Sequence, residues 1–242
     1  DKIKVKTFRA TMEKGKVKAY PAAKGKLLEM YAQRDPRMNA TVLLPYTKYI
    51  GWYANAQEDC EFVIAPSITS GKGYVRVNGN YEIYLWRKFV PEGNMGGALN
   101  NRAHTPINFP LIRYADVLLM LAECQNELGD QEGAVKLINQ VRARKSVEMP
   151  GINSGPDYLK ATTKAEVFER IRHERAVELA GEGHSFSDMK RWKLLETLNG
   201  RTEKDITGRF RYTRVVTARD YLWPIPADEI EKNDKLTQNP NW

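Results

Sequence analysis

YADVLLMLAECQNELGDQEGAVKLINQV, residues 114 to 141, is the stretch that decides the fold of this 242-residue chain. Its apolar residues recur at spacings of three and four, which predicts two amphipathic helices separated by a short turn at Gly129-Asp130. A turn this short makes the helices antiparallel neighbours. The small Ala122 and Ala134 and the bulky Ile138 match a tetratricopeptide unit of about 34 residues. Such units complete their core by stacking, so the neighbours of this single copy are either unrecognisable or outside this chain.

Composition indicates a globular chain that does not cross a membrane. Hydrophobic residues make up 42% of the sequence, but the longest apolar runs, such as residues 117–122, fall short of the roughly 20 residues that a span needs. The net charge of +8 is concentrated in residues 1–26, which hold nine Lys or Arg and two acids and so carry +7. No nucleic-acid docking element accompanies these charges, so we expect no nucleic-acid partner. The first residues lack the pattern of a secretory signal, so the chain is expected to be mature, truncated or cytosolic.

The residue pattern changes near residue 110, from loop and strand signals to helical periodicity. Residues 1–110 are predicted to form a loop-rich segment with strands, and residues 111–242 a helical region. The elements expected before residue 110 are a strand at 3–8, a helix from Lys26 to before Asp35-Pro36, an extended segment at 40–46, a β-hairpin joining 74–77 to 81–86 across Asn78-Gly79, and a long loop at 91–110. The fold class expected is therefore mainly α, with tetratricopeptide-like helix pairs, long loops and a small β-hairpin.

A third helix is predicted after residue 163, where Thr163 and Glu166 have the spacing of a capping box. The apolar stripe of this helix continues onto Glu174, Arg175 and Glu178, so charged groups occupy positions expected to be buried. Because an unpaired buried charge is very costly, these groups must be ion-paired. The arginines that surround them in the sequence, and that we expect as partners, are Arg170, Arg172, Arg175 and Arg191.

The break at 181–183 is expected to stop this helix, and a short helix capped near Ser185 or Ser187 follows it. Met189 and Trp192 of that helix are predicted to face inward. The two cysteines, Cys60 and Cys124, lack metal-site spacing, and Cys124 is predicted to belong to the core because it lies in an apolar helical run.

Catalytic and metal sites are both disfavoured by the sequence. A zinc-protease helix would repeat its histidine four residues after His173, and it does not; His184 lies beyond the glycine break. Glu174 and Glu178 have the spacing of neighbours on a helix, but carboxylates paired with arginine are poor general acids. Nucleophile elbows and phosphate-cradling glycine loops are missing from the sequence, and His104 stands alone in a loop. We therefore expect a protein that is not an enzyme and that uses no cofactor.

Several stretches resemble a known family. These are DPRMNATVL (35–43), NFPLIRYADVLLMLAEC (108–124), INQVRAR (138–144), ERAVELAGEGHSFSDMKRW (174–192), YLWPIPADEI (221–230) and QNPNW (238–242). In this order they resemble the C-terminal half of the SusD/RagB nutrient-binding proteins. One departure is His184, where that family often has arginine.

The resemblance implies a non-catalytic lipoprotein on the surface of the outer membrane of Bacteroidetes-like bacteria. Such a protein would capture oligosaccharides or polysaccharides and deliver them to a SusC-like TonB-dependent transporter. Members of this family are mostly helical and about twice as long as this chain, and their lipid-bearing cysteine precedes the region matched. The resemblance therefore implies that an N-terminal half is missing or is a separate piece, and that membrane attachment is only through a lipid anchor outside this chain.

Aromatic side chains are the candidate ligand contacts, because flat rings pack against the C–H faces of sugars. Loop aromatics are better candidates than core ones, and those singled out here are Tyr46, Tyr49, Trp52, Tyr53 and, on a predicted strand, Trp86. Trp192 and Trp223 are instead assigned to the core. The alternative function is that of a tetratricopeptide-type scaffold that binds peptides or a partner protein in a helical groove.

Overall fold

The computed structural model describes residues 9–14, 16–53, 56–64, 74–76, 85–99, 104–204 and 210–242, except for the side chains of residues 52, 53 and 74–76. Its α-helices are α1 (Lys24–Ala32), α2 (Arg37–Thr41), α3 (Tyr114–Glu127), α4 (Gln131–Arg142), α5 (Lys164–Glu178), α6 (His184–Arg191) and α7 (Ala227–Glu231). Short 3₁₀ helices are η2 (Met95–Gly97), η3 (Asp157–Leu159), η4 (Leu195–Leu198) and η5 (Ala218–Tyr221). The strands are β1 (Thr11–Glu13), β2 (Lys16–Ala19), β3 (Val42–Leu43), β4 (Lys48–Tyr53), β5 (Ala56–Val63), β6 (Tyr74–Arg76), β7 (Leu85–Trp86), β8 (Thr202–Lys204) and β9 (Phe210–Thr213).

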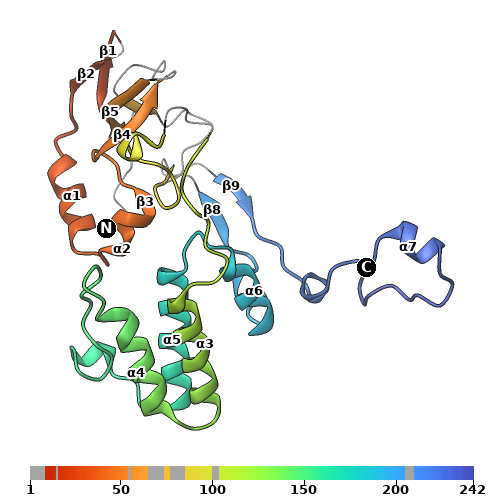
Figure 1. Ribbon diagram of the computed structural model, residues 1–242. Helices are drawn as coiled ribbons and strands as arrows, with labels where there is room; N and C mark the ends of the chain where they lie inside the picture. Colours follow the sequence, from red (N-terminus) through yellow and green to blue (C-terminus); the bar gives the residue numbers. More distant parts are fainter. Residues whose placement is uncertain are drawn as a thin grey trace. The chain divides into compact units, whose positions relative to one another are not determined.

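The predicted helical hairpin is confirmed, and a third helix packs against it. α3 and α4 are antiparallel neighbours, and α5 lies alongside both of them (Figure 1). The core between these helices is apolar, and its fully buried members are Leu119, Ala122, Ala134, Ile138, Val167 and Ile171. Their spacing of three and four residues along each helix is what gives each helix one buried face. The mainly helical fold class is thus confirmed.

The start of α5 is fixed by the capping box that the sequence predicts. The Thr163 hydroxyl accepts a hydrogen bond from the Glu166 amide, and the Glu166 carboxylate accepts from the Thr163 amide. Two amide donors that the helix itself cannot satisfy are thereby paired. Because of this cap, the register of α5 is defined from its first turn.

Strands form only small sheets among the described residues. β1 pairs with β2, β3 with β7, and β8 with β9, each antiparallel, while β5 lies between antiparallel β4 and parallel β6. The turn of the hairpin predicted across Asn78-Gly79 lies outside the described residues, as does the strand expected at 3–8. The flanking elements that are described, β6 and β7, belong to different sheets.

Contacts divide the chain into two compact units, residues 1–182 and 183–242. The first unit contains the sheets from β1 to β7 and the α3–α5 bundle, and the second begins at α6. The predicted division at residue 110 was between a loop-rich segment and a helical region, and it stays a prediction. No helix in the described ranges combines the length and the apolar character needed to cross a bilayer.

The structure corrects four local expectations. α2 is a helical turn that the sequence patterns did not predict, and it begins directly after Pro36. α6 is capped by Gly183 in a left-handed conformation, with no side-chain cap from Ser185 or Ser187. Cys124 is exposed, because it lies on the face of α3 opposite the core.

The fourth correction concerns the two tryptophans assigned to the core. Trp192 is only partly buried. Trp223 is exposed, and its ring lies 6.2 Å from that of Phe186. The tryptophan of the Pro-Ile-Pro stretch is therefore a surface residue in this structure.

Candidate functional site

Three carboxylates form a row at the C-terminal end of α5. Glu174, Glu178 and Glu182 are spaced four residues apart, so their side chains stack along one face of the helix and its end. All three are buried, and Glu174 is only 1% exposed. A row of buried negative charges is stable only if cations and hydrogen bonds compensate for the lost solvation.

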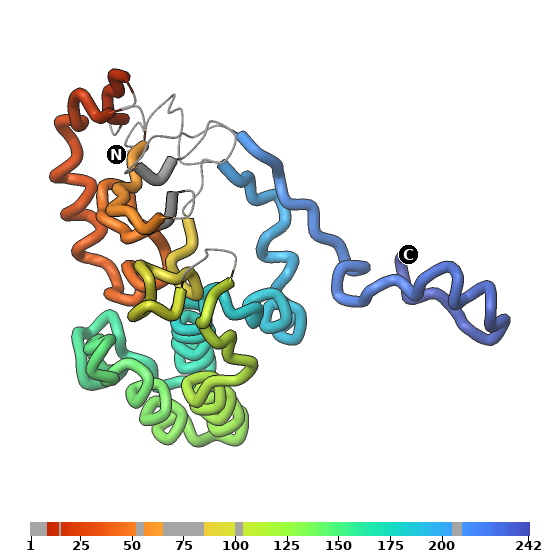
Figure 2. The backbone as a smooth tube through the Cα atoms, turned by 45° about the horizontal axis from the view of Figure 1, so that its top comes forward, coloured from red at the N-terminus to blue at the C-terminus, as the bar shows by residue number. Residues whose placement is uncertain are grey.

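Five cations from separate parts of the chain supply this compensation. They are Arg37 of α2, Lys88 after β7, Arg113 before α3, Arg142 at the end of α4, and Arg144 just beyond it. The trace of the chain shows how α2 comes close to the C-terminal end of α5 (Figure 2). We call these eight residues, the three glutamates and the five cations, the charge cluster.

The innermost member of the charge cluster is Glu174, which binds two arginines. One carboxylate oxygen lies 2.6 Å from Arg37, and the other lies 2.9 Å from Arg142. Arg37 is also held by Asp35, at 2.6 Å. This guanidinium therefore joins the Asp35 loop to the middle of α5.

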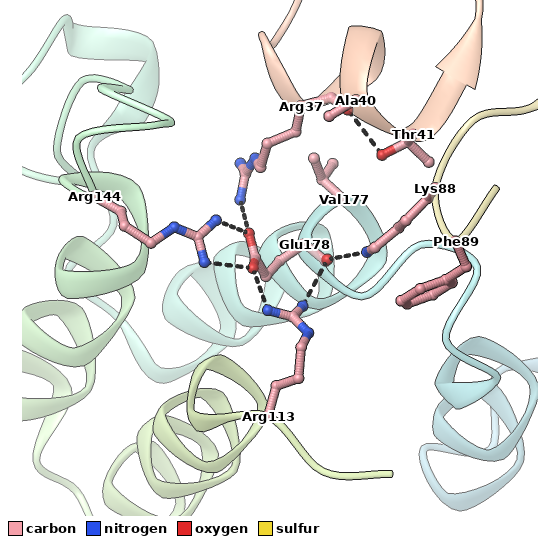
Figure 3. Close-up of a pocket in the computed structure, with 9 residues that line it drawn as sticks. All are labelled: Arg37, Ala40, Thr41, Lys88, Phe89, Arg113, Arg144, Val177 and Glu178. Carbon is pink, nitrogen blue, oxygen red and sulfur yellow. Dashed lines mark hydrogen bonds and ion pairs between the residues drawn. The ribbon is translucent and has the colours of Figure 1, made fainter. Parts of the chain in front are cut away.

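Glu178 binds three arginines from three directions (Figure 3). Arg144 donates to both carboxylate oxygens at 2.9 Å, while Arg37 and Arg113 each donate to one of them at 3.0 Å. Paired bonds of this kind are the strongest geometry between arginine and a carboxylate. Glu178 is therefore the point at which α2, α4 and the start of α3 are tied to α5.

Lys88 caps the C-terminal end of α5 with hydrogen bonds from its side chain. Its ammonium group donates to the carbonyls of Glu178 and Ala180, both at 3.1 Å, and to the Glu182 carboxylate at 2.5 Å. Helix C-termini leave carbonyls unpaired and carry partial negative charge, so a cation there is favourable. Arg113 completes the arrangement with two bonds to Glu182, at 2.6 and 2.7 Å.

These partners differ from the arginines that the sequence neighbourhood suggested. Arg170 bonds to the carbonyl of Tyr158, Arg172 pairs with Glu169, Arg175 with Asp116, and Arg191 with Asp188. The prediction that Glu174, Arg175 and Glu178 are buried and paired is confirmed. The prediction of which arginines pair with the two glutamates is wrong, because residues of distant segments cover this face of α5.

The electrostatics of the cluster favour the ionised form of two of its carboxylates, Glu178 and Glu182. Burial alone would raise the pKa of Glu178, but bonds from Arg144, Arg37 and Arg113 lower that pKa below its ordinary value. The pKa of Glu182 is lowered in the same way, by Arg113 and Lys88 acting against burial. A general acid needs a raised pKa, so neither group is suited to donate a proton near neutral pH.

A pocket of about 230 Å³ opens beside the cluster. Its walls come from α2, from the segment after β7 and from the end of α5, with Arg113 and Arg144 at its edge (Figure 3). Ala40, Phe89 and Val177 give the pocket apolar surface next to the paired charges. The charged groups that line the pocket are paired with one another. A ligand in the pocket would therefore mainly meet apolar surface of a defined shape and no unpaired charge among these residues.

Among the predicted ligand-binding aromatics, Tyr46 and Tyr49 are engaged within the protein. Tyr46 is buried, and its hydroxyl donates to the carbonyl of Ile64 at 3.3 Å. The Tyr49 hydroxyl donates to the carbonyl of Pro91 at 2.8 Å. Burial raises the pKa of Tyr46 to about 12 and also raises that of Tyr49. The ring of Tyr46 is not open to a ligand in this structure.

Trp52 and Tyr53 lie on β4, but their side chains are outside the described residues. Of the five predicted aromatics, Trp86 is the one described as exposed, at 55%. It pairs with Val42 across the β3–β7 ladder, and its ring lies against Gly181. The structure thus brings Trp86 next to the end of α5, where Lys88 of the charge cluster binds.

Within the described ranges, no group of three or more His, Cys, Asp or Glu side chains is arranged to hold a metal ion. The carboxylates of the charge cluster are occupied by arginine and lysine. This arrangement provides ion pairing and surface contact.

The functional-site residues that motif reasoning missed are the cations of the cluster. Four of them were nevertheless inside the stretches that carry the family resemblance: Arg37 in 35–43, Arg113 in 108–124, and Arg142 and Arg144 in 138–144. The sequence signal for this cluster was a row of glutamates in one of these stretches together with arginines in three others, which could have been expected to pair. The folded chain brings all four stretches together at the end of α5.

Comparison with known proteins identifies the family. The model of the SusD family matches residues 5–242. A SusD-like protein of Formosa agariphila, P38, is 34% identical over 138 residues, which cover 54% of this chain and 24% of that protein. Another SusD-like protein of the same organism, P2, is 34% identical over 149 residues, covering 60% of this chain and 28% of that protein.

Solved structures agree with this fold. A SusD-like carbohydrate binding protein of Bacteroides fragilis has 26% identity and a TM-score of 0.58, over 84% of this chain and 42% of that one. A second SusD-like protein of B. fragilis superposes with a TM-score of 0.62 at 24% identity, over 88% of this chain and 40% of that one. The matched stretches cover about a quarter of the length of these two curated relatives. With a family model covering nearly every residue, and the stretches that carry the resemblance meeting at one buried charge cluster, this chain belongs to the SusD family.

Proposed function

We propose that this protein binds oligosaccharides or polysaccharides at the cell surface without cleaving them. The observation that carries the proposal is membership of the SusD family over residues 5–242. One solved relative is named a SusD-like carbohydrate binding protein, and a surface glycan-binding protein of Bacteroides uniformis is also among the structural neighbours.

Trp86 is the residue of the described structure best suited to contact a sugar ring. It is exposed, its indole lies against Gly181, and it precedes Lys88 and Phe89, which line the pocket at the end of α5, by two and three residues. Carbohydrate sites combine such flat aromatic surfaces with a few polar groups. We also propose Trp52, Tyr53 and Tyr49 as contacts. Tyr46 could contact a sugar only if its buried ring became exposed.

The absence of catalysis is part of the proposal, and the electrostatics of the charge cluster support it. Glu178 and Glu182 have lowered pKa values and several cationic partners each. A glycosidase needs one carboxyl group with a raised pKa and a second one facing the substrate. Glu178 and Glu182 fit neither role.

Delivery of the bound glycan to a TonB-dependent transporter of the outer membrane is the further step we propose. It is supported by the family resemblance alone. Co-purification of this protein with its neighbouring transporter from detergent-treated outer membranes is the expected result. Recovery of the transporter without it would argue against a stable partnership.

The test of binding is affinity electrophoresis through gels that contain a panel of plant, algal and host polysaccharides. We expect at least one polysaccharide to retard the protein, and Trp86→Ala to reduce the retardation. Tyr158→Ala is the control, because Tyr158 is also an exposed aromatic residue but lies on η3, outside the proposed site. Migration unaffected by every polysaccharide would contradict the proposal, and new reducing ends in the incubated glycan would contradict its non-catalytic part.

A further inference from the structure

The pocket beside the charge cluster combines apolar walls with charged residues. Ala40 of α2, Phe89 after β7 and Val177 of α5 contribute the apolar side chains (Figure 3). Four of the nine lining residues are nevertheless arginine or lysine, and one is Glu178. What the pocket binds therefore depends on whether these charged groups have hydrogen-bonding capacity left.

Glu178 and Lys88 have no such capacity left. A carboxylate has about four lone-pair sites, and an ammonium group has three N–H donors. The Glu178 carboxylate accepts four hydrogen bonds, all of them from arginines. The Lys88 ammonium group donates three, to two carbonyls and a carboxylate. A polar group that enters the pocket therefore gains no hydrogen bond from either residue.

The arginines of the pocket differ in what they can still offer. Among the described residues, the guanidinium groups of Arg37 and Arg113 each make four hydrogen bonds with their five N–H groups. In the same part of the chain, Arg144 uses two N–H groups, both for Glu178, and its side chain is 41% exposed. The remaining donors of the pocket are thus concentrated at its edge, on Arg144.

Phe89 is held in the pocket wall by a strained backbone. Its φ is +63°, in the left-handed region that a bulky residue rarely adopts. The preceding amide, of Lys88, donates to the carbonyl of Thr41 at 3.2 Å, and the Phe89 ring lies 5.1 Å from that of Phe109. Strained residues of this kind cluster at ligand-binding sites. The conformation of Phe89 therefore indicates that a ligand uses its ring.

The size of the pocket limits what enters it. Pockets that enclose a drug-sized ligand have about 300–1,000 Å³, whereas this one has about 230 Å³. It has room for one small group and not for an oligosaccharide chain. A hydroxyl group in it would lose its water and find Glu178 and Lys88 already occupied, which is unfavourable. A methyl group loses nothing and gains contact with the apolar walls.

We propose that this pocket binds a methyl group carried by a neutral sugar unit, either the C6 methyl of a 6-deoxyhexose or the methyl of an acetyl ester. This inference rests on the proposed function, because it names the unit of the glycan that the protein recognises. The methyl group packs against Ala40, Phe89 and Val177. The hydroxyls of the same sugar accept hydrogen bonds from the remaining N–H groups of Arg144 at the edge.

The experiment compares sugars that differ only at this group. Methyl α-L-fucoside and methyl α-L-rhamnoside are the 6-deoxy forms of methyl α-L-galactoside and methyl α-L-mannoside, and the 6-O-acetyl hexosides are the second arm. NMR titration of the 242-residue chain gives the dissociation constants. In at least one series we expect the 6-deoxy or the acetylated sugar to bind roughly tenfold or more tighter than its parent hexoside. The arm that binds identifies the source of the methyl group.

Three variants locate the selection in the pocket. Ala40→Leu fills the pocket from α2 and is expected to abolish the preference for the methyl group. Val177→Thr replaces a methyl group of the wall by a hydroxyl of similar size and should reduce the preference. Ala32→Leu is the matched control, because it makes the first change at an exposed position of α1 and should retain the preference. Far-UV circular dichroism verifies that each variant keeps its helices.

The comparison within each series is made on the native chain, so the inference can fail without any variant. Equal affinities within every series, or no binding of any of these sugars, would overturn it. A preference that Ala40→Leu leaves unchanged would also overturn it, because the selection would then lie elsewhere. If a polysaccharide retards the protein in the gel panel and the affinities are equal, the inference alone falls. If no polysaccharide retards it and no sugar binds, the proposed function falls as well.

Discussion

Replacement of Glu174 by alanine tests the structural role of the charge cluster most directly. The variant removes two charge-assisted hydrogen bonds, of 2.6 Å from Arg37 and 2.9 Å from Arg142, at a side chain that is 1% exposed. Among the residues that the structure describes, Arg142 then keeps its bond to the carbonyl of Pro150, while Arg37 keeps Asp35 and Glu178. A buried cation thus loses its anion, which typically costs about 3–5 kcal/mol.

That magnitude agrees with a sum over individual bonds. Hydrogen bonds to charged groups contribute about 1.5–3 kcal/mol each, so two of them give a similar range. In a urea titration followed by far-UV circular dichroism, with a slope of about 3 kcal/mol/M, the unfolding midpoint should fall by about 1–1.7 M.

Glu169→Ala is the matched control for this variant. Glu169 lies on the same helix and also pairs with an arginine, Arg172, but its side chain is exposed. Exposed pairs of this spacing contribute about 0.3–0.5 kcal/mol, so the midpoint should hardly change. The reasoning is refuted if Glu174→Ala costs less than about 1 kcal/mol, or if the two variants are equally destabilised.

Three further predictions concern pH, a glycine and the helix cap. Bonds from arginines outweigh burial and lower the pKa of Glu178 below its ordinary 4.5, so its carboxylate stabilises the fold above pH 4.5 and this contribution is lost as pH falls further. The difference in unfolding free energy between the native chain and Glu178→Gln should therefore shrink from pH about 7 to pH about 3.5. Gly181→Ala should destabilise the protein by about 1–3 kcal/mol and alter tryptophan fluorescence, because φ is +79° and the new Cβ would lie 3.0 Å from the ring of Trp86. Bonds from neighbouring backbone amides and from the Thr163 hydroxyl lower the pKa of Glu166 to about 2. Thr163→Ala removes the hydroxyl, so an NMR titration should show the pKa of Glu166 raised toward its ordinary 4.5.

Each of these has an outcome that would contradict it. A pH-independent effect of Glu178→Gln would mean that its ion pairs do not set its ionisation. Gly129→Ala is the control for Gly181→Ala, since φ is +92° there but no atom lies within 4 Å of the added Cβ. Equal effects at the two glycines would leave no role for the ring of Trp86. A Glu166 pKa near 4.5 in the native chain would argue against the capping box.

Local patterns predicted the elements that depend on local physics. The apolar spacing of α3 and α4 and the Thr163–Glu166 pair each concern residues within one or two helical turns, and all were confirmed. The same spacing predicted that Glu174 and Glu178 are buried and must be paired. It could not predict their partners, because Arg37 and Arg113 are 141 and 65 residues away from Glu178 and only the folded chain brings them together.

The errors have the same origin. Cys124 was placed in the core because its neighbours are apolar, but α3 has two apolar faces and Cys124 lies on the outer one. Sequence spacing shows that residues share a face without showing whether that face is covered. For a related reason, spacing does not show whether Tyr46 or Trp86 is exposed. Tyr46 turns its hydroxyl to a backbone carbonyl inside the fold, while Trp86 is held on the surface by β3 and Gly181.

The attachment of Lys88 to the end of α5 has a consequence for its neighbour Trp86. The Lys88 ammonium group is fastened to two carbonyls and a carboxylate, and the amides of Arg87 and Lys88 both bond to the carbonyl of Thr41. The backbone that follows Trp86 is thereby anchored to α2 and to the end of α5. A molecule that meets the exposed indole meets a side chain whose backbone is already fixed, so little backbone entropy is lost on contact.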